Sequence, residues 1–306
     1  MATAAPQPLL LYVPGLKPKP ETMAYRQQLW RCLIEGVKRC DAQTARQMAN
    51  MPDCFHVAGW TQGFYGEDRD IQLDLPAIEA VLSQRTATDR DIAEATSLRR
   101  RLMQLVYRIG DRLPFLIPRL ANDGLRETLQ DVRRYMKNLD GCAEEARLHV
   151  WEPLVDALDD DRPVLLIAHS MGSILSYDCL WLLGRIRQSP RRVDTWLTMG
   201  SPLGKRFVRQ LLQGASLPEP DRYPRTIRRW INLVAVGELT ATERCLARRF
   251  AGMARGGLID SIEDYDVFNY FRSDGVLNVH TEYGYLVNEQ CGSLIAEWWK
   301  SQLPAA

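Results

Sequence analysis

The sequence lacks the features that would assign it to several common protein classes. Its seven cysteines are odd in number and include no Cys-x-x-Cys pair, so they predict neither a disulfide framework nor a zinc site. Lysine and arginine together (39) nearly balance aspartate and glutamate (38). No overall positive charge is therefore available to attract nucleic acid, and we expect no nucleic-acid partner.

Long apolar runs are also missing near the N-terminus. The run at 9–13 has no basic stretch before it and ends at Pro14-Gly15. It is too short for a signal sequence or a membrane span, so we expect a cytoplasmic protein. With 306 residues, 46% hydrophobic and 25% charged, the chain has the composition of a globular protein with one elaborated domain.

Short apolar runs bounded by turn residues recur along the chain and predict strands at 9–13, 54–60, 163–168, 194–199, 230–236 and 265–271. Helical periodicity predicts helices at 21–40, 171–187, 203–213, 240–251 and about 284–300. This alternation predicts an α/β fold: a mostly parallel sheet of about six or more strands with helices on both faces.

One stretch, 84–160, contains helical patterns and no convincing strand. We interpret it as a helical cap inserted into a core formed by 1–83 and 161–306. Its residues Leu98, Leu102, Leu105, Val106 and Ile109 fall at helical spacing, which we attribute to packing on neighbouring helices rather than to membrane contact. In the segment 113–118, two prolines break helicity, and the segment is interpreted either as a lid element or as core packing of the insertion.

The segment Ala168-His169-Ser170-Met171-Gly172 follows a buried-strand run at 164–167 and precedes a helical pattern. A serine on a strained turn between strand and helix presents its hydroxyl at the end of the sheet, and small neighbours leave room for approaching backbone. We therefore favour Ser170 as a nucleophile over the alternative that it only caps the following helix.

A serine nucleophile needs a base, and histidine is the usual one at neutral pH. The chain has only four histidines. His169 belongs to the turn of Ser170, His56 lies inside a predicted strand and His149 in a predicted helix. His280 follows the last predicted strand, where sites of α/β proteins assemble, and is therefore the predicted base.

The third member of such a site is an acid that comes between the serine and the histidine in the sequence. Glu238 follows the predicted strand 230–236 and is our choice, with Glu243, Asp264 and Asp274 as alternatives. The first predicted strand ends in Val13-Pro14-Gly15-Leu16, a tight turn near Ser170 in this fold. The backbone amides of Leu16 and Met171 are therefore the predicted oxyanion-binding groups, although a plain strand-ending turn is an equal alternative.

These motifs, together with Met199-Gly200-Ser201-Pro202-Leu203, resemble the α/β-hydrolase superfamily, in particular its lipase- and esterase-type members, including the GPI-inositol-deacylase-like serine esterases. The sequence departs from the usual pattern at Ala168, where Gly is commoner, at Pro14, where His-Gly is common, and at Glu238, where Asp is commoner. The resemblance implies that the insertion caps the site and sets substrate specificity.

The predicted function is hydrolysis of a carboxylic ester or thioester by a Ser170-His280-Glu238 triad, through an acyl-enzyme and without metal or organic cofactor. The partner is a small-molecule ester or acyl substrate. Acyl transfer or amide hydrolysis would use the same triad. A non-catalytic domain that binds a ligand or a protein, and a peripheral membrane lipase, are the alternatives from other classes.

Overall fold

The computed structural model describes residues 6–112 and 123–302, with the backbone alone at 110, 112 and 123–125. Its centre is a six-stranded parallel sheet in the order β2-β1-β3-β4-β5-β6. The strands are β1 (Leu9–Val13), β2 (Phe55–Val57), β3 (Val164–His169), β4 (Val193–Met199), β5 (Ile227–Ala235) and β6 (Ser261–Val267). The predicted α/β fold class is confirmed.

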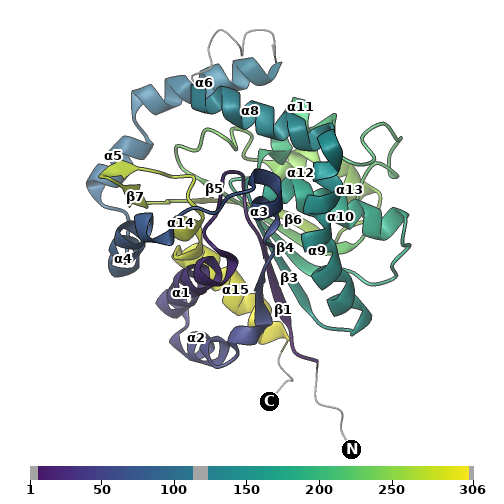
Figure 1. Ribbon diagram of the computed structural model, residues 1–306, viewed down its shortest axis with the longest axis horizontal. Coiled ribbons are helices and arrows are strands. Elements are labelled where there is room, and N and C mark those ends of the chain that lie inside the picture. Colours follow the sequence, from purple (N-terminus) through teal and green to yellow (C-terminus); the bar gives the residue numbers. More distant parts are fainter. Residues whose placement is uncertain (1–5, 113–122, 303–306) are drawn as a thin grey trace, which may run out of the picture.

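Helices cover both faces of this sheet (Figure 1). One face carries α1 (Thr22–Cys40), α2 (Ala42–Ala49), α14 (Glu282–Leu286) and α15 (Glu289–Ser301). The other carries α9 (Cys142–Asp159), α10 (Gly172–Arg185), α12 (Leu246–Arg249) and α13 (Ala251–Arg255). Successive residues of a strand point to opposite faces, so Leu10 and Tyr12 pack toward the first group, and Leu9, Leu11 and Val13 toward the second.

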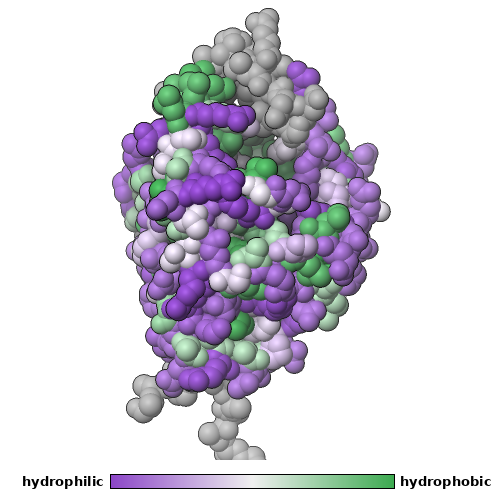
Figure 2. Space-filling view, turned by 90° about the vertical axis from the view of Figure 1, so that its left-hand side faces the viewer, coloured by the Kyte–Doolittle hydropathy of each residue, from purple (hydrophilic) through white to green (hydrophobic). Residues whose placement is uncertain are grey.

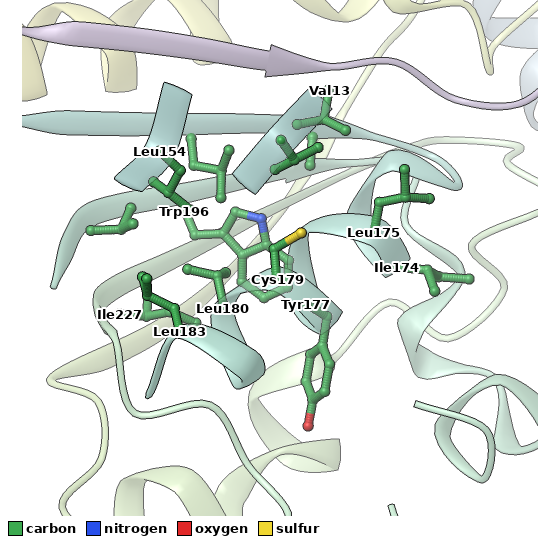
Figure 3. Close-up of a cluster of buried hydrophobic side chains, with 14 of the residues drawn as sticks. Val13, Leu154, Ile174, Leu175, Tyr177, Cys179, Leu180, Leu183, Trp196 and Ile227 are labelled. Carbon is green, nitrogen blue, oxygen red and sulfur yellow. The ribbon is translucent and has the colours of Figure 1, made fainter. Parts of the chain in front are cut away.

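The core on the α10 side is built around Trp196 of β4. Figure 3 shows its indole among Leu154 of α9 and Leu180 and Leu183 of α10. Trp196 also stacks on Trp230 of the neighbouring strand, with ring centroids 4.4 Å apart. Large aromatic surfaces buried in this way contribute strongly to stability, and they hold β4 and α10 against each other.

The sequence misplaced β6. Its strand 261–267 starts four residues before the predicted 265–271, because this edge strand alternates charged residues instead of forming an apolar run. Glu263 of β6 is bound by the guanidinium of Arg229 on β5. An ion pair therefore links this edge strand to β5, and the strand lacks the apolar pattern by which buried strands are recognised in a sequence.

Two predicted helices are wrong as continuous elements. Only α11 (Arg206–Arg209) forms within 203–213, and 240–245 form no helix before α12. The amides of Leu239 and Thr240 donate to the Glu238 carboxylate, and Asp264 accepts from the amides of Leu246 and Ala247. Side-chain acceptors therefore delay the start of that helix until Leu246.

The stretch 84–160 contains α5 (Asp89–Ala95), α6 (Leu98–Arg112), α8 (Asp123–Met136) and α9. Helices α6 and α8 lie above the carboxyl ends of the strands (Figure 1). Helix α9 instead packs on β1, β3 and α10 through buried Val150, Leu154 and Ala157. The expected cap thus includes one helix that belongs to a layer of the sheet. The segment 113–118, predicted as a lid or as packing, lies outside the described residues.

The apolar stripe of α6 faces outward, which corrects our expectation that it packs on neighbouring helices. Leu98, Leu102, Leu105 and Ile109 are 82%, 61%, 52% and 39% exposed. Hydrophobic residues also gather at the height of α6 on the face drawn in Figure 2. In the part of the chain that the structure describes, no helix combines the length and apolar character needed to span a membrane.

The remaining elements are short and lie around the sheet. They are α3 (Trp60–Tyr65), α4 (Leu75–Ser83), β7 (Arg272–Ser273) and β8 (Val276–Leu277), the last two forming a small antiparallel pair.

Candidate active site

The site lies where the strand order changes direction. The chain moves from β1 outward to β2 and then returns to the other side of β1 for β3. The carboxyl ends of β1 and β3 therefore lie side by side, and the connections that leave them diverge, which opens a crevice at this edge. Leu16 follows β1 there, and Ser170 follows β3.

Ser170 occupies the sharp turn between β3 and α10, with a φ of 51°, in the left-handed region that non-glycine residues rarely adopt. Backbone crowds this turn. A Cβ on Gly15 would lie 2.9 Å from the Ser170 Cβ, and one on Gly172 would lie 2.2 Å from the Val13 carbonyl oxygen. Ser170 therefore lies, with small neighbours, on a strained turn between a strand and a helix, as the motif predicted.

His280 lies against Ser170, although 110 residues separate them in the sequence: its Nε2 is 2.9 Å from the Ser170 Oγ. Its Nδ1 is 2.8 Å from Oε2 of Glu238. Because a carboxylate only accepts, Nδ1 carries the proton and Nε2 is free to accept from the serine hydroxyl. The structure thus brings the predicted nucleophile, base and acid into one chain of hydrogen bonds.

Glu238 is 2% exposed, and both of its carboxylate oxygens accept hydrogen bonds. Oε1 accepts from the amides of Leu239 and Thr240, both at 2.8 Å. Oε2 accepts from His280 and, at 3.3 Å, from the Tyr285 hydroxyl. Four donors compensate the burial of this carboxylate and fix the direction in which it faces the imidazole.

The two partners shift each other's pKa in opposite directions. Burial alone would lower the pKa of His280, but the charge and hydrogen bond of Glu238 raise it above its usual 6.5. Burial alone would raise the pKa of Glu238, but His280 and the two amides lower it. This arrangement favours a charged pair once His280 has taken up a proton.

His169 lies directly beside His280. Its Nε2 donates to the His280 carbonyl oxygen at 2.6 Å, and burial together with the neighbouring His280 lowers the pKa of His169 to about 3. It is therefore a neutral positioning group. The two other histidines are remote: exposed His56 bonds to the Asp53 carbonyl, and exposed His149 lies on α9.

Gly200, after β4, lies against both His280 and Glu238. Its φ is 57°, and a Cβ there would lie 3.0 Å from the His280 Nδ1 and 3.3 Å from the Glu238 Oε2. The Gly in the Met199-Gly200-Ser201-Pro202-Leu203 segment thus has a local reason, since any side chain would press on the His280–Glu238 contact.

The alternative acids lie elsewhere. Glu243 pairs with Arg249, Asp264 accepts from the Asn232 amide and from two backbone amides, and exposed Asp274 sits in the β7–β8 turn. Of the four carboxylates considered, the hydrogen bond to His280 is made by Glu238.

Leu16 and Met171 both line the cavity next to Ser170. Within the described part of the chain, neither backbone amide donates to a protein acceptor. Met171 also precedes the first residue of α10, where amides are left without helical partners. The two predicted oxyanion donors are thus beside the serine and unengaged.

The sequence did not predict the role of α6 in holding this site. Arg100 of α6 donates to the carbonyls of Gly237 and Leu277, at 3.1 and 2.9 Å. Gln104 donates to the Glu238 carbonyl at 3.0 Å. The polar side of α6 thereby binds the loops that carry Glu238 and His280. A local sequence pattern gives no signal for contacts to such distant carbonyls.

Two cavities open on Ser170 and His280. The larger, of about 570 Å³, is walled mainly by apolar side chains from the loop after β1 and from α8, α10, α11 and β8, such as Leu16, Leu129, Val132, Ile174 and Val208. The smaller, of about 370 Å³, has walls that are more polar than those of the larger and include Lys19, Arg69, Asp74 and Glu282. Among the described residues, no cluster of three or more His, Cys, Asp or Glu could hold a metal ion.

Comparison with known proteins leaves this site to be interpreted from its geometry: no protein-family model, curated protein or solved structure matches the chain.

Proposed function

We propose that this protein is a serine hydrolase of the α/β-hydrolase type that cleaves a carboxylic ester or thioester. The observation that carries the proposal is the hydrogen-bond chain from Ser170 Oγ to His280 Nε2 and from His280 Nδ1 to Glu238 Oε2, at 2.9 and 2.8 Å. Geometry of this kind, with a strained serine on a strand-to-helix turn, is what nucleophilic catalysis by serine requires.

In the proposed reaction His280 takes the proton of Ser170 as its Oγ attacks the acyl carbonyl carbon. Glu238 stabilises the imidazolium that forms, and the amides of Leu16 and Met171 bind the negative oxygen. His280 then gives the proton to the leaving alcohol or thiol, which leaves an acyl-Ser170 ester. Water, deprotonated by His280, releases the acid and regenerates the serine.

The larger cavity supports an aliphatic acyl group as the part of the substrate next to the carbonyl. Its apolar walls adjoin Ser170 directly, whereas the smaller cavity is lined by charged pairs such as Lys19–Glu282 and Arg69–Asp74. Burial of a chain against apolar walls contributes about 0.8 kcal/mol per methylene group.

The direct test is labelling with a fluorophosphonate, which reacts with activated serines. We expect the native protein to gain one adduct, located by mass spectrometry on Ser170, and Ser170→Ala to gain none. An unlabelled native protein would favour a non-catalytic ligand-binding domain. Product analysis with an added alcohol distinguishes hydrolysis from acyl transfer.

The pH profile of kcat/KM should report His280. Only its neutral form accepts the serine proton, so activity rises as pH rises through its pKa, with the half-maximum expected above 6.5 because the pKa is raised. In Glu238→Gln the charge that raises the pKa is gone while burial still lowers it. The residual activity should therefore reach half-maximum at lower pH, and an unshifted or upward-shifted profile would contradict the pairing.

A specific feature also favours action at a membrane surface. The polar side of α6 is bound to the loops of the site, so its apolar residues Leu98, Leu102, Leu105 and Ile109 face outward. Exposed Arg99 and Arg101 alternate with them. A helix with an apolar face and basic residues beside it suits the interface of a membrane with anionic lipid.

We expect the protein to co-sediment with vesicles that contain phosphatidylglycerol at low salt, and less so at high salt, because salt screens the arginine charges. Leu102→Glu/Leu105→Glu should abolish this binding. The matched control, Leu73→Glu/Leu211→Glu, also alters two exposed leucines, 64% and 53% exposed, and should leave it intact. Native protein that stays in the supernatant would exclude the membrane version of the function.

A further inference from the structure

The larger cavity contains a cation for which the proposed hydrolysis has no use. Lys205 lies between β4 and α11, at the position that precedes Arg206, and lines the same cavity as Ser170. Its Nζ lies over the ring of Tyr107 on α6, 5.5 Å from the centroid. A cation held against an aromatic face keeps its charge and its hydrogen-bond donors available to a ligand.

The other charged groups of this cavity already have partners. Arg100 donates to two carbonyls, and Glu238 and His280 bond to each other. In the described part of the chain, the Lys205 ammonium has no hydrogen bond or ion pair with the protein. Asp111 acts on it only at long range, since its carboxylate accepts from the amides of Arg206 and Phe207.

The smaller cavity provides the contrast. Lys17, Lys19 and Arg69 line it, and each forms an ion pair, with Glu127, Glu282 and Asp74 respectively. Cations on that side of Ser170 are neutralised by the protein itself. The positive charge that no described residue compensates lies in the apolar cavity.

A lysine held inside a mainly apolar wall without a counter-ion is energetically unfavourable. Burial lowers the pKa of Lys205, and the distant charges of Asp111 and Glu238 oppose this only in part. A negatively charged ligand group would compensate the desolvated ammonium with a charge-assisted hydrogen bond, which is about twice as strong as a neutral one.

We propose that the substrate is an ester that carries a carboxylate or phosphate group, bound by Lys205 in the cavity that also receives its apolar part. This inference rests on the proposed function and narrows its substrate class from aliphatic esters to anionic ones. Lys205 determines specificity and takes no part in the transfer of the proton.

Matched pairs of esters test this. One pair places the charge in the acyl part: 4-nitrophenyl hydrogen adipate against 4-nitrophenyl hexanoate. Two pairs place it in the alcohol: 4-hexanoyloxybenzoate against its methyl ester, and 4-hexanoyloxyphenyl phosphate against its dimethyl ester. The pair with the largest ratio of kcat/KM identifies the position of the charge and distinguishes carboxylate from phosphate.

We expect wild-type protein to prefer the anionic member of one pair by about tenfold, which corresponds to about 1.4 kcal/mol. Lys205→Met should bring that ratio close to one and leave kcat/KM for the neutral ester within about threefold, since apolar contacts are kept. Lys205→Arg should keep the preference. Lys38→Met, which removes an exposed lysine on α1, controls for net charge.

Equal activity on both members of every pair, or an equal loss on both in Lys205→Met, would overturn the inference. Binding to Ser170→Ala separates it from the proposed function, because that variant measures recognition without turnover. Tighter binding of the anionic ester that is lost in Ser170→Ala/Lys205→Met supports the role of Lys205 even if the native protein hydrolyses no ester. Equal binding of both members rejects that role even if hydrolysis is observed.

Discussion

Ser170→Ala is expected to lower kcat for ester hydrolysis by about 10⁶-fold, which is the scale of loss for the nucleophile of a serine triad. The variant has no hydroxyl to attack the carbonyl, and His280 loses the group from which it takes a proton. Alanine is smaller than serine, so the crowded turn between β3 and α10 should still form. Steady-state rates and circular dichroism of the variant measure the two effects separately.

Ser176→Ala is the matched control, because it removes a buried hydroxyl from α10 whose partner, within residues 6–112 and 123–302, is the Gly172 carbonyl. We expect its kcat to stay within about threefold of wild type. Comparable losses in both variants would attribute the effect to damage of α10. Near-native activity of Ser170→Ala would refute the assignment of the nucleophile.

Glu238→Gln should lower kcat by about 10⁴-fold with the fold retained, the scale measured when a triad acid becomes an amide. The amides of Leu239 and Thr240 require an oxygen, so the glutamine would turn its NH₂ group toward His280. His280 Nδ1 must then accept, and its proton moves to Nε2. An imidazole in that tautomer cannot take the proton of Ser170.

Asp274→Asn changes one of the other carboxylates considered for this role. Asp274 is exposed and has a φ of 50°, which asparagine also tolerates. The activity of the Asp274→Asn variant should therefore remain near that of wild type. A near-native Glu238→Gln, or a large loss in Asp274→Asn, would refute the assignment of Glu238 as the acid of the site. Both variants are compared at the pH optimum of the wild type.

The features that local chemistry dictates could be read from the sequence. The buried strands β1, β3, β4 and β5 are short apolar runs, and their alternation with helices predicts the parallel sheet. Ser170 stands out because small residues flank it between a strand and a helix. His280 and Glu238 follow from chain order, since the ends of parallel strands meet at one edge. For the strands and for Ser170, the pattern lies within a few residues.

Other features depend on contacts between distant segments. The leucines of α6 form an ordinary amphipathic pattern. The bonds made by the polar side of this helix, among them those of Arg100 and Gln104 to the loops of Glu238 and His280, turn that pattern outward. Likewise α9 has the same helical periodicity as its neighbours, but its apolar side packs on the sheet. Periodicity predicts that a helix has an apolar and a polar face, but it does not predict which part of the protein or solvent each face contacts.

The sequence by itself determined the α/β class and predicted Ser170 and His280 as partners at the edge of the sheet, with Glu238 as one of four candidate carboxylates. The hydrogen bond to His280 then distinguished Glu238 from the other three. Tertiary structure alone decided that Lys205 has no counter-ion among the described residues that line the cavity of Ser170, and that Glu238 is held by four donors. The physical reason is range: a strand or a turn follows from neighbouring residues, whereas the balance of charge in a cavity depends on groups that only folding brings together.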